Sequence, residues 1–246
     1  MKPQFKQIVT VVFSVFLLSC SSDEISSETS DSPIISIPKI PLASSIKYLA
    51  LGDSYTIGQS VCETCNYPQQ LNTSLEAIYP ETKFSLKIIA KTGWTTSNLI
   101  SAINEDNPQS NYDLVMLLIG VNNQYQGINF SVYEKEFPEL LNKAIALAKG
   151  DKKNVVVISI PDYAFTPFGT MFGGTTKIST EIAQYNSFAE NYCKANEVTF
   201  VSITDITQKG LQIPSLVAGD GLHPSKEAYT LFVERILPKV KVALQD

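Results

Sequence analysis

The feature that most constrains this chain is a set of five short apolar runs separated by longer amphipathic stretches. The runs cover residues 46–51, 84–90, 114–119, 155–160 and 198–203. Nearly continuous apolar segments of this length are typical of strands buried on both faces of a parallel sheet. Alternation of such strands with helical segments predicts a single α/β domain. We therefore expect a doubly wound (flavodoxin-like) five-stranded parallel sheet with helices on both faces.

The segments between the later runs have helical spacing, with apolar residues at steps of three and four. One such set begins at Glu134 and continues with the apolar residues Phe137, Leu140, Leu141, Ala144, Ile145 and Ala148. A second is Ile182, Tyr185, Phe188, Ala189 and Tyr192. A last helix is expected over residues 226–244, with Pro224 near its first turn.

The N-terminus has the pattern of an export signal. Lys2 and Lys6 precede an apolar run over residues 8–18, which is too short to span a bilayer comfortably. The run ends at Ser19-Cys20, which resembles a bacterial lipobox, and the sequence predicts a lipoprotein signal peptide over residues 1–19 with lipid on Cys20. An ordinary secretory signal and a retained anchor are the alternatives.

Residues 20–45 are rich in Ser, Pro, Asp and Glu and carry no helical or strand period. They predict a disordered tether, followed by the folded domain over residues 46–246. The expected location is the extracytoplasmic side of the cell envelope, lipid-anchored at an outer membrane, facing either the periplasm or the cell surface.

Charge and cysteine content restrict the partners. The formal net charge is −5, and loss of residues 1–19 would make it more negative, so we expect no nucleic-acid binding. Cys62 and Cys65 predict a local disulfide in an oxidising compartment. Zinc would need further ligands, which only Cys193 and His223 could supply, so neither metal nor cofactor is expected. Cys193 is expected to be a small buried apolar residue.

Polar residues directly follow the first three apolar runs, where binding sites of doubly wound sheets lie. Ser54 follows Gly52-Asp53, and N–H groups of a helix starting there would favour developing negative charge. Alternatively, these residues only cap that helix. Gly93 would let a backbone N–H approach a ligand, or is a plain loop glycine. The amide of Asn122 could donate into the cleft, or mark a turn.

His223 is the only histidine of the chain, and Asp220 precedes it by three positions. The carboxylate could bond one ring nitrogen and leave the other to take a proton from Ser54. Together these segments resemble four sequence blocks of the SGNH (GDSL-like) hydrolase family over about residues 46–240. The blocks are Gly52-Asp53-Ser54-Tyr55, Gly93, Gly120-Val121-Asn122 and Asp220-Gly221-Leu222-His223-Pro224.

That resemblance implies a catalytic triad of Ser54 as nucleophile, His223 as general acid–base and Asp220 as the residue that orients it. It also implies an oxyanion hole formed by the backbone N–H groups of Ser54 and Gly93 and the side chain of Asn122. One departure is Asn123, where many members of the family have aspartate.

The expected activity is hydrolysis of small-molecule carboxylic esters, with short acyl groups or acetylated sugars as substrates. The alternatives are a lysophospholipase or thioesterase, or a surface binding module that kept the fold and lost catalysis. The candidate pocket residues are Tyr55, Trp94, Phe165 and Phe168. Phe165 and Phe168 could instead simply pack their loop against the domain.

Overall fold

In the computed structural model, residues 42–172 and 175–245 are described. The predicted signal peptide, the predicted lipid site at Cys20 and the predicted tether as far as residue 41 lie outside the described residues. Within the described ranges, none of the helices combines the length and the apolar character needed to span a bilayer.

Five parallel strands form one sheet in the order β2-β1-β3-β4-β5, which confirms the predicted fold class. The strands are β1 (Ser45–Gly52), β2 (Lys83–Ala90), β3 (Leu114–Leu118), β4 (Val155–Ile158) and β5 (Thr199–Val201). Gly52 pairs with Ala90 on one side and with Leu118 on the other. Three neighbouring strands therefore end side by side, and the segments that follow them share one edge of the sheet.

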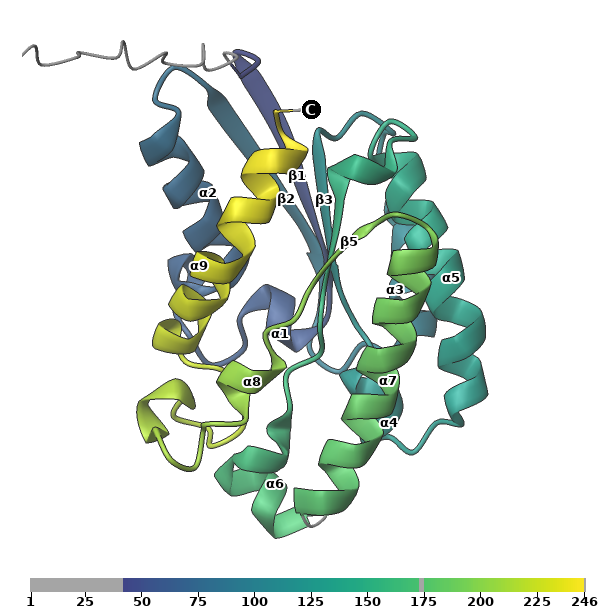
Figure 1. Ribbon diagram of the computed structural model, residues 1–246, viewed down its shortest axis with the longest axis vertical. Coiled ribbons are helices and arrows are strands. Elements are labelled where there is room, and N and C mark those ends of the chain that lie inside the picture. The colour runs from purple at the N-terminus through teal and green to yellow at the C-terminus, as the bar shows by residue number, and fades with distance from the viewer. Residues whose placement is uncertain (1–41, 173–174, 246) are drawn as a thin grey trace, which may run out of the picture. The chain divides into compact units, whose positions relative to one another are not determined.

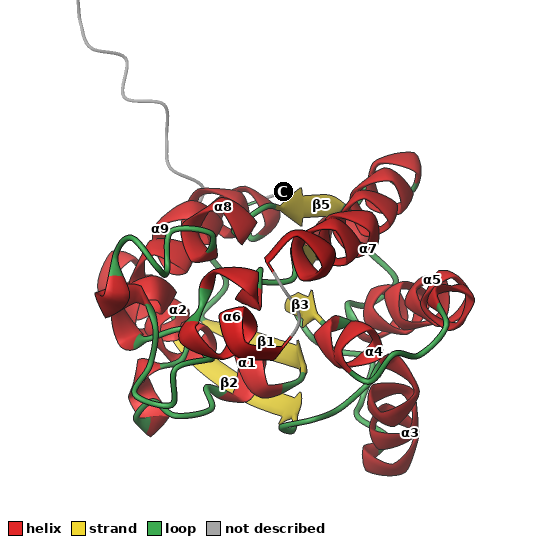
Figure 2. Ribbon diagram, turned by 90° about the horizontal axis from the view of Figure 1, so that it is seen from below, coloured by secondary structure: helices red, strands yellow, loops and turns green. Residues whose placement is uncertain are grey.

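Long helices cover both faces of the sheet (Figures 1 and 2). One face carries α2 (Tyr67–Ile78) and α9 (Lys226–Ala243), and the other carries α3 (Thr96–Asp106), α5 (Phe130–Leu147) and α7 (Thr175–Ala195). Short helices lie among the connections: α1 (Ser54–Ile57), α4 (Val121–Tyr125), α6 (Pro167–Phe172) and α8 (Thr204–Thr207). Single 3-10 turns are η1 (Glu63–Cys65), η2 (Lys152–Asn154), η3 (Tyr163–Phe165) and η4 (Pro214–Leu216).

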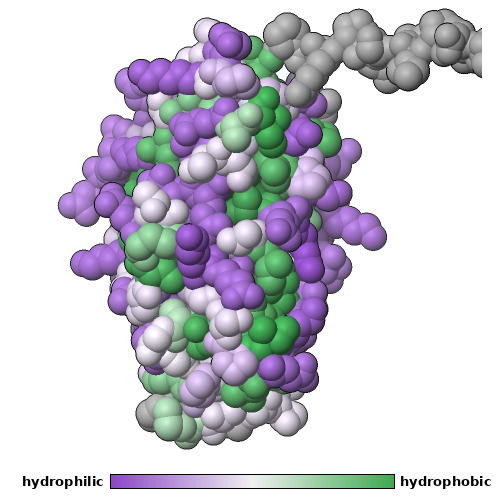
Figure 3. Space-filling model, turned by 90° about the vertical axis from the view of Figure 1, so that its left-hand side faces the viewer, coloured by the Kyte–Doolittle hydropathy of each residue, from purple (hydrophilic) through white to green (hydrophobic). Residues whose placement is uncertain are grey.

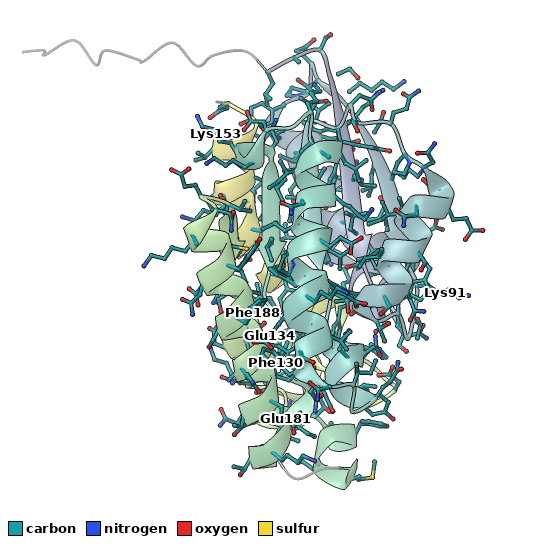
Figure 4. All side chains as sticks on the ribbon, turned by 90° about the vertical axis from the view of Figure 1, so that its right-hand side faces the viewer. Lys91, Phe130, Glu134, Lys153, Glu181 and Phe188 are labelled. Atoms are coloured by element: carbon teal, nitrogen blue, oxygen red, sulfur yellow. A yellow bond between two sulfur atoms is a disulfide. The ribbon has the colours of Figure 1, made fainter. Side chains whose placement is uncertain are left out.

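The core lies on both sides of the central strands. Every residue of β3 and β4 is buried, because helices cover both of their faces. Between α5 and α7, Phe130 and Phe188 pack edge-to-face at 5.9 Å (Figure 4), and Tyr133 packs against Tyr185 at 4.6 Å. These aromatic contacts fix the helical layer on that side of the sheet.

The predicted helical segments correspond to α5, α7 and α9, and Cys193 of α7 is fully buried. Pro224 comes shortly before the first turn of α9 and forms an antiparallel bridge with Val217, while Ser225 caps the helix by accepting the N–H of Ala228. Figure 3 shows the side that carries α2 and α9, where hydrophilic side chains lie on either side of a narrower apolar band.

Candidate active site

The turn from β1 into α1 places Ser54 at the carboxyl edge of the sheet. Gly52 is required there, because a Cβ atom would lie 2.4 Å from the carbonyl oxygen of Leu118. Asp53 then caps α1, with its Oδ1 accepting the N–H of Tyr55 at 3.0 Å. Ser54 is the first residue of that helix and is 4% exposed. Its hydroxyl is therefore held at a fixed point at the end of a central strand.

Asp53 is itself completely buried beneath this turn. Among the described residues, no group forms a hydrogen bond with its Oδ2 atom. Burial raises the pKa of Asp53 from 3.8 to about 7, although the hydrogen bond from the N–H of Tyr55 acts in the opposite direction. Near neutral pH, the carboxyl group next to the serine is therefore protonated and neutral in a large fraction of the molecules.

Gly93 and Asn122 form a second side of the site, after β2 and β3. Gly93 has φ +85°, a left-handed conformation that favours glycine. The Asn122 amide donates to the carbonyl oxygen of Trp94 at 2.9 Å, and the Gln126 amide donates to that of Gly93 at 3.2 Å. Within residues 42–172 and 175–245, no acceptor takes the backbone N–H of Ser54 or of Gly93.

Asn123, the position that departs from the family pattern, fixes the start of α3. Its Oδ1 accepts the N–H of Thr96 at 3.0 Å, and its Nδ2 donates to the Thr96 hydroxyl at 2.6 Å. That hydroxyl in turn donates to Glu136 at 2.5 Å. An amide serves here because it can both accept and donate, whereas an aspartate could not donate to a hydroxyl whose proton is already engaged.

Asp220 and His223 form the third side, in the loop that leads to α9. The Nδ1 atom of His223 lies 2.6 Å from Oδ2 of Asp220, and Oδ1 accepts the N–H groups of Leu222 and His223. The Ser60 hydroxyl also donates to Oδ2, at 2.6 Å. Partial burial disfavours the charged form, but these hydrogen bonds together hold the pKa of Asp220 well below its usual range. The carboxylate is therefore ionised when it faces the imidazole.

The three sides meet around one cavity of about 290 Å³. Ser54, His223, Gly93 and Asn122 all line it. The Tyr55 ring packs edge-on against the imidazole, with ring centres 5.8 Å apart. In the described part of the chain, neither the Ser54 hydroxyl nor the Nε2 atom of His223 forms a hydrogen bond, so both can interact with a bound molecule. The fold thus brings the predicted nucleophile and the predicted base to one cavity at the carboxyl edge of the sheet.

Aromatic side chains form much of the remaining cavity wall. Of the predicted pocket residues, Tyr55 and Phe168 line the cavity, whereas Trp94 and Phe165 do not. The latter two are half-buried and pack against the hydrophobic core. The other apolar or aromatic lining residues are Val121, Tyr125, Tyr163 and Leu222. Tyr125 could have been found from its position on the helical turn after Asn122, and Tyr163 from its place in the aromatic stretch after β4.

Cys62 and Cys65 are joined by a disulfide in the segment that follows α1. The Asn66 amide donates to the carbonyl oxygens of Ile57 and Glu63, which closes the base of this segment. Among the described residues, no three acidic, histidine or cysteine side chains cluster in a way that could hold a metal ion.

A hydroxyl, an imidazole held by a carboxylate and two unpaired backbone N–H groups, all beyond the carboxyl ends of parallel strands, are the groups expected of a hydrolase with a serine nucleophile. The family comparison agrees with a hydrolase. The model of the GDSL-like lipase/acylhydrolase family matches residues 50–231, and the chain therefore belongs to this family.

Solved structures share the fold at low sequence identity. The acetylxylan esterase Axe2 from Geobacillus stearothermophilus has a TM-score of 0.61 at 19% identity, covering 82% of this chain and 96% of its own. A member of the lipolytic protein G-D-S-L family from Veillonella parvula has a TM-score of 0.61 at 18% identity, covering 78% and 97%. The esterase EstA from Pseudoalteromonas sp. has a TM-score of 0.57 at 16% identity, covering 81% and 99%. Among curated proteins, none matches this chain by sequence.

Proposed function

We propose that this protein is a serine esterase that hydrolyses carboxylic esters through an acyl-enzyme. The observation that carries the proposal is the shared cavity, which is lined both by the Ser54 hydroxyl and by the His223 imidazole. The imidazole is held from its other side by Asp220 at 2.6 Å, which leaves Nε2 directed to accept a proton.

In the first half of the reaction, the Ser54 oxygen attacks the ester carbonyl carbon while His223 takes the hydroxyl proton. The negative charge that develops on the carbonyl oxygen is stabilised by the N–H groups of Ser54 and Gly93 and by the Asn122 amide. Asp220 stabilises the imidazolium. The carbon–oxygen bond to the alcohol then breaks, and the alcohol leaves with the proton from His223.

In the second half, water attacks the acyl-enzyme. His223 takes a proton from the water, and the same donors hold the charge on the carbonyl oxygen. The bond between the acyl carbon and the Ser54 oxygen breaks, Ser54 regains its proton from His223, and a carboxylic acid is released.

The size and lining of the cavity favour substrates with small acyl groups. A volume of about 290 Å³ is at the lower end for ligand pockets, and aromatic rings such as Tyr125 and Phe168 form its wall. Tyr125 is 54% exposed, so it could also contact the alcohol part of a substrate, such as a sugar ring. Acetylated sugars and short acyl esters are therefore the proposed substrates, in agreement with the acetylxylan esterase activity named for one structural neighbour.

A substrate panel tests this proposal. We expect kcat/KM for p-nitrophenyl esters to decrease from acetate to octanoate. Acetylated xylan tests a natural polymer, from which the enzyme should release acetate. Higher activity on octanoate, on lysophospholipids or on acyl thioesters would instead favour a lysophospholipase or a thioesterase. No turnover of any ester would favour a binding module.

The Ser54→Ala variant tests the nucleophile. It should lower kcat by several orders of magnitude with an unchanged circular dichroism spectrum, because only the covalent step is lost. Ser101→Ala removes an exposed hydroxyl on α3 and should leave the rate unchanged. A fluorophosphonate should react with the Ser54 hydroxyl, with loss of HF, and leave its phosphonyl group on the peptide that contains Ser54, which mass spectrometry detects. Wild-type-like turnover by Ser54→Ala would rule out the proposed mechanism.

We further propose that the protein is lipid-anchored through Cys20 on the extracytoplasmic side of the cell envelope. The support is the sequence pattern at residues 1–20 alone. Cys20→Ala should move the protein from the membrane fraction to the soluble fraction, while unchanged membrane partition would contradict lipidation.

A further inference from the structure

Ser60 makes a contact with the proposed triad that the sequence motifs do not include. Its hydroxyl donates to Oδ2 of Asp220 at 2.6 Å. The same oxygen atom lies 2.6 Å from Nδ1 of His223. One carboxylate oxygen is therefore held between a hydroxyl and the imidazole, although Ser60 and Asp220 are 160 positions apart in the chain.

The backbone of Ser60 is in an unfavourable conformation that its hydroxyl contact can explain. Its φ is +67°, in the left-handed region that residues with a side chain rarely adopt. Ser60 is exposed, so burial of its side chain does not impose this conformation. Strained backbone of this kind persists where surrounding interactions fix it, often at functional sites.

The segment around Ser60 connects the nucleophile to the acid–base loop. The carbonyl oxygen of Ser54 accepts the N–H groups of Gly58 and Gln59, directly before Ser60. After Ser60, the Cys62–Cys65 disulfide and the hydrogen bonds of Asn66 hold the segment. Ser60 is thus presented by a short and constrained stretch that is continuous with α1.

We propose that Ser60 is a positioning residue of the active site, which fixes the Asp220 carboxylate so that it orients and charges the His223 imidazole correctly. This inference rests on the proposed esterase function. Ser60 does not line the cavity around Ser54, so it acts through Asp220 and has no contact with the substrate.

The chemical effect has a definite sign. A hydroxyl that donates to Oδ2 withdraws negative charge from the oxygen that faces the imidazole. Without that donor, the carboxylate attracts the imidazolium more strongly, and its side chain is also less firmly oriented. The proton should then stay on His223 to higher pH, and the ring should be a poorer match for the Ser54 hydroxyl.

Among the described residues, the side-chain hydrogen bond of Ser60 is to Asp220 and not to the other ionisable groups near the imidazole. Tyr55 packs edge-on against the ring, and Asp162 and Tyr163 line a small cavity next to it. Tyr229 is fully buried on α9, and Asp220 adds to the burial effect that raises the pKa of this tyrosine. Asp53 is buried below α1. A change in the titration of His223 can therefore be assigned to the link between Ser60 and Asp220.

The lone histidine makes the test direct, because it gives one set of imidazole NMR signals. We compare wild type with Ser60→Ala, Ser60→Gly and Ser60→Asn in the full chain. Alanine and glycine both remove the hydroxyl, but glycine also relieves the left-handed backbone. Asparagine tolerates this backbone and keeps an N–H donor.

For Ser60→Ala and Ser60→Gly, we expect the imidazole signals to titrate at higher pH than in wild type. The acid limb of the kcat/KM profile with p-nitrophenyl acetate should move in the same direction. At the optimum, kcat should fall about tenfold with KM unchanged, as for loss of one hydrogen bond to a charged group. Ser60→Asn should recover part of both effects.

Two results would overturn the proposal. One is an unchanged titration and an unchanged kcat in both the alanine and the glycine variants. The other is wild-type behaviour of Ser60→Gly alone, which would make backbone strain the cause instead of the hydroxyl. If wild type hydrolyses no ester, the proposed function fails separately, and the NMR titration still decides whether Ser60 controls the Asp220–His223 pair.

Discussion

The two halves of the candidate site are held in different ways. Ser54 and Asn122 follow directly from β1 and β3, and they are 4% and 9% exposed. Asp220 and His223 stand in a loop, where 30% of the Asp220 side chain is exposed. The strand-end half is fixed by packing of a sheet and its short helices, whereas the loop half is fixed by hydrogen bonds.

The loop half has few buried residues to stabilise it. The carbonyl oxygen of His223 accepts the N–H of Ala218 at 2.7 Å, and Val217 bridges to Pro224. The Asp220 carboxylate accepts hydrogen bonds from two N–H groups of its own turn and from the hydroxyl of Ser60. We therefore expect substitutions in the strand-end half to change both stability and rate, and substitutions in the loop half to change the rate with little change in stability.

The largest effect on the rate in the strand-end half is expected for Asn122→Ala. Loss of one oxyanion donor typically lowers kcat by about 10²–10³. Gln126→Ala is the matched control, since its exposed amide contacts the carbonyl oxygen of Gly93 without lining the cavity. It should lower kcat only a few-fold. Equal losses in the two variants, measured at saturating p-nitrophenyl acetate, would mean that Asn122 only holds the loop.

Asp53 should make the strand-end half sensitive to pH. Its native pKa is raised to about 7, whereas the unfolded chain ionises near 3.8. Its contribution to folding is therefore fully present below about pH 4, is lost as the pH rises towards 7, and stays constant above that. Asp53→Asn keeps the helix cap and cannot ionise. At pH 8 it should unfold with a free energy higher by about 4 kcal/mol than wild type.

Urea unfolding at pH 4 and at pH 8 measures this difference. The gap between Asp53→Asn and wild type should narrow strongly at pH 4, because the carboxyl group is neutral in the native state and pH 4 lies close to its unfolded pKa of 3.8. A gap of the same size at both pH values would show that the burial of Asp53 carries no ionisation cost.

Asn123→Asp should damage the strand-end half through its hydrogen bonds. The change replaces an N–H donor to Thr96 by an acceptor in a fully buried place, which should destabilise the fold by about 1–3 kcal/mol. Glu136→Gln supplies a matched background for this change. An amide at position 136 could donate to the Thr96 hydroxyl, whose own proton would then be free to bond the new carboxylate at position 123. The double variant should regain part of the lost stability in urea unfolding. Simple additivity would contradict this directional chain of hydrogen bonds.

These differences also explain how far the sequence could predict the molecule. The sequence predicts the strands because burial on both faces makes each one continuously apolar, and the rule for strand ends then points to Ser54, Gly93 and Asn122. Contacts between distant polar side chains left no local pattern. Ser60 was missed because nothing near it in sequence indicates that it meets Asp220. Trp94 and Phe165 lie outside the cavity lining, since aromatic residues near a cleft can turn to the core equally well.

The smallest expected effect tests how the loop half is supported. Changing Cys62 and Cys65 together to serine removes the disulfide that constrains the segment after Ser60. The segment keeps the hydrogen bonds of Asn66, so kcat should fall only about two- to fivefold, an effect of less than about 1 kcal/mol.

A double-mutant cycle shows whether this effect passes through Ser60. If the disulfide acts by presenting the Ser60 hydroxyl to Asp220, its removal should have no further effect on kcat in the Ser60→Ala background. A full additional loss there would mean that the disulfide supports the site by another route, for instance through α1 and Ser54. Thermal unfolding of the same four proteins separates rate from stability. The cycle would then show whether the loop half of the site depends on the contact between Ser60 and Asp220 alone or on the whole segment from Ser60 to Asn66.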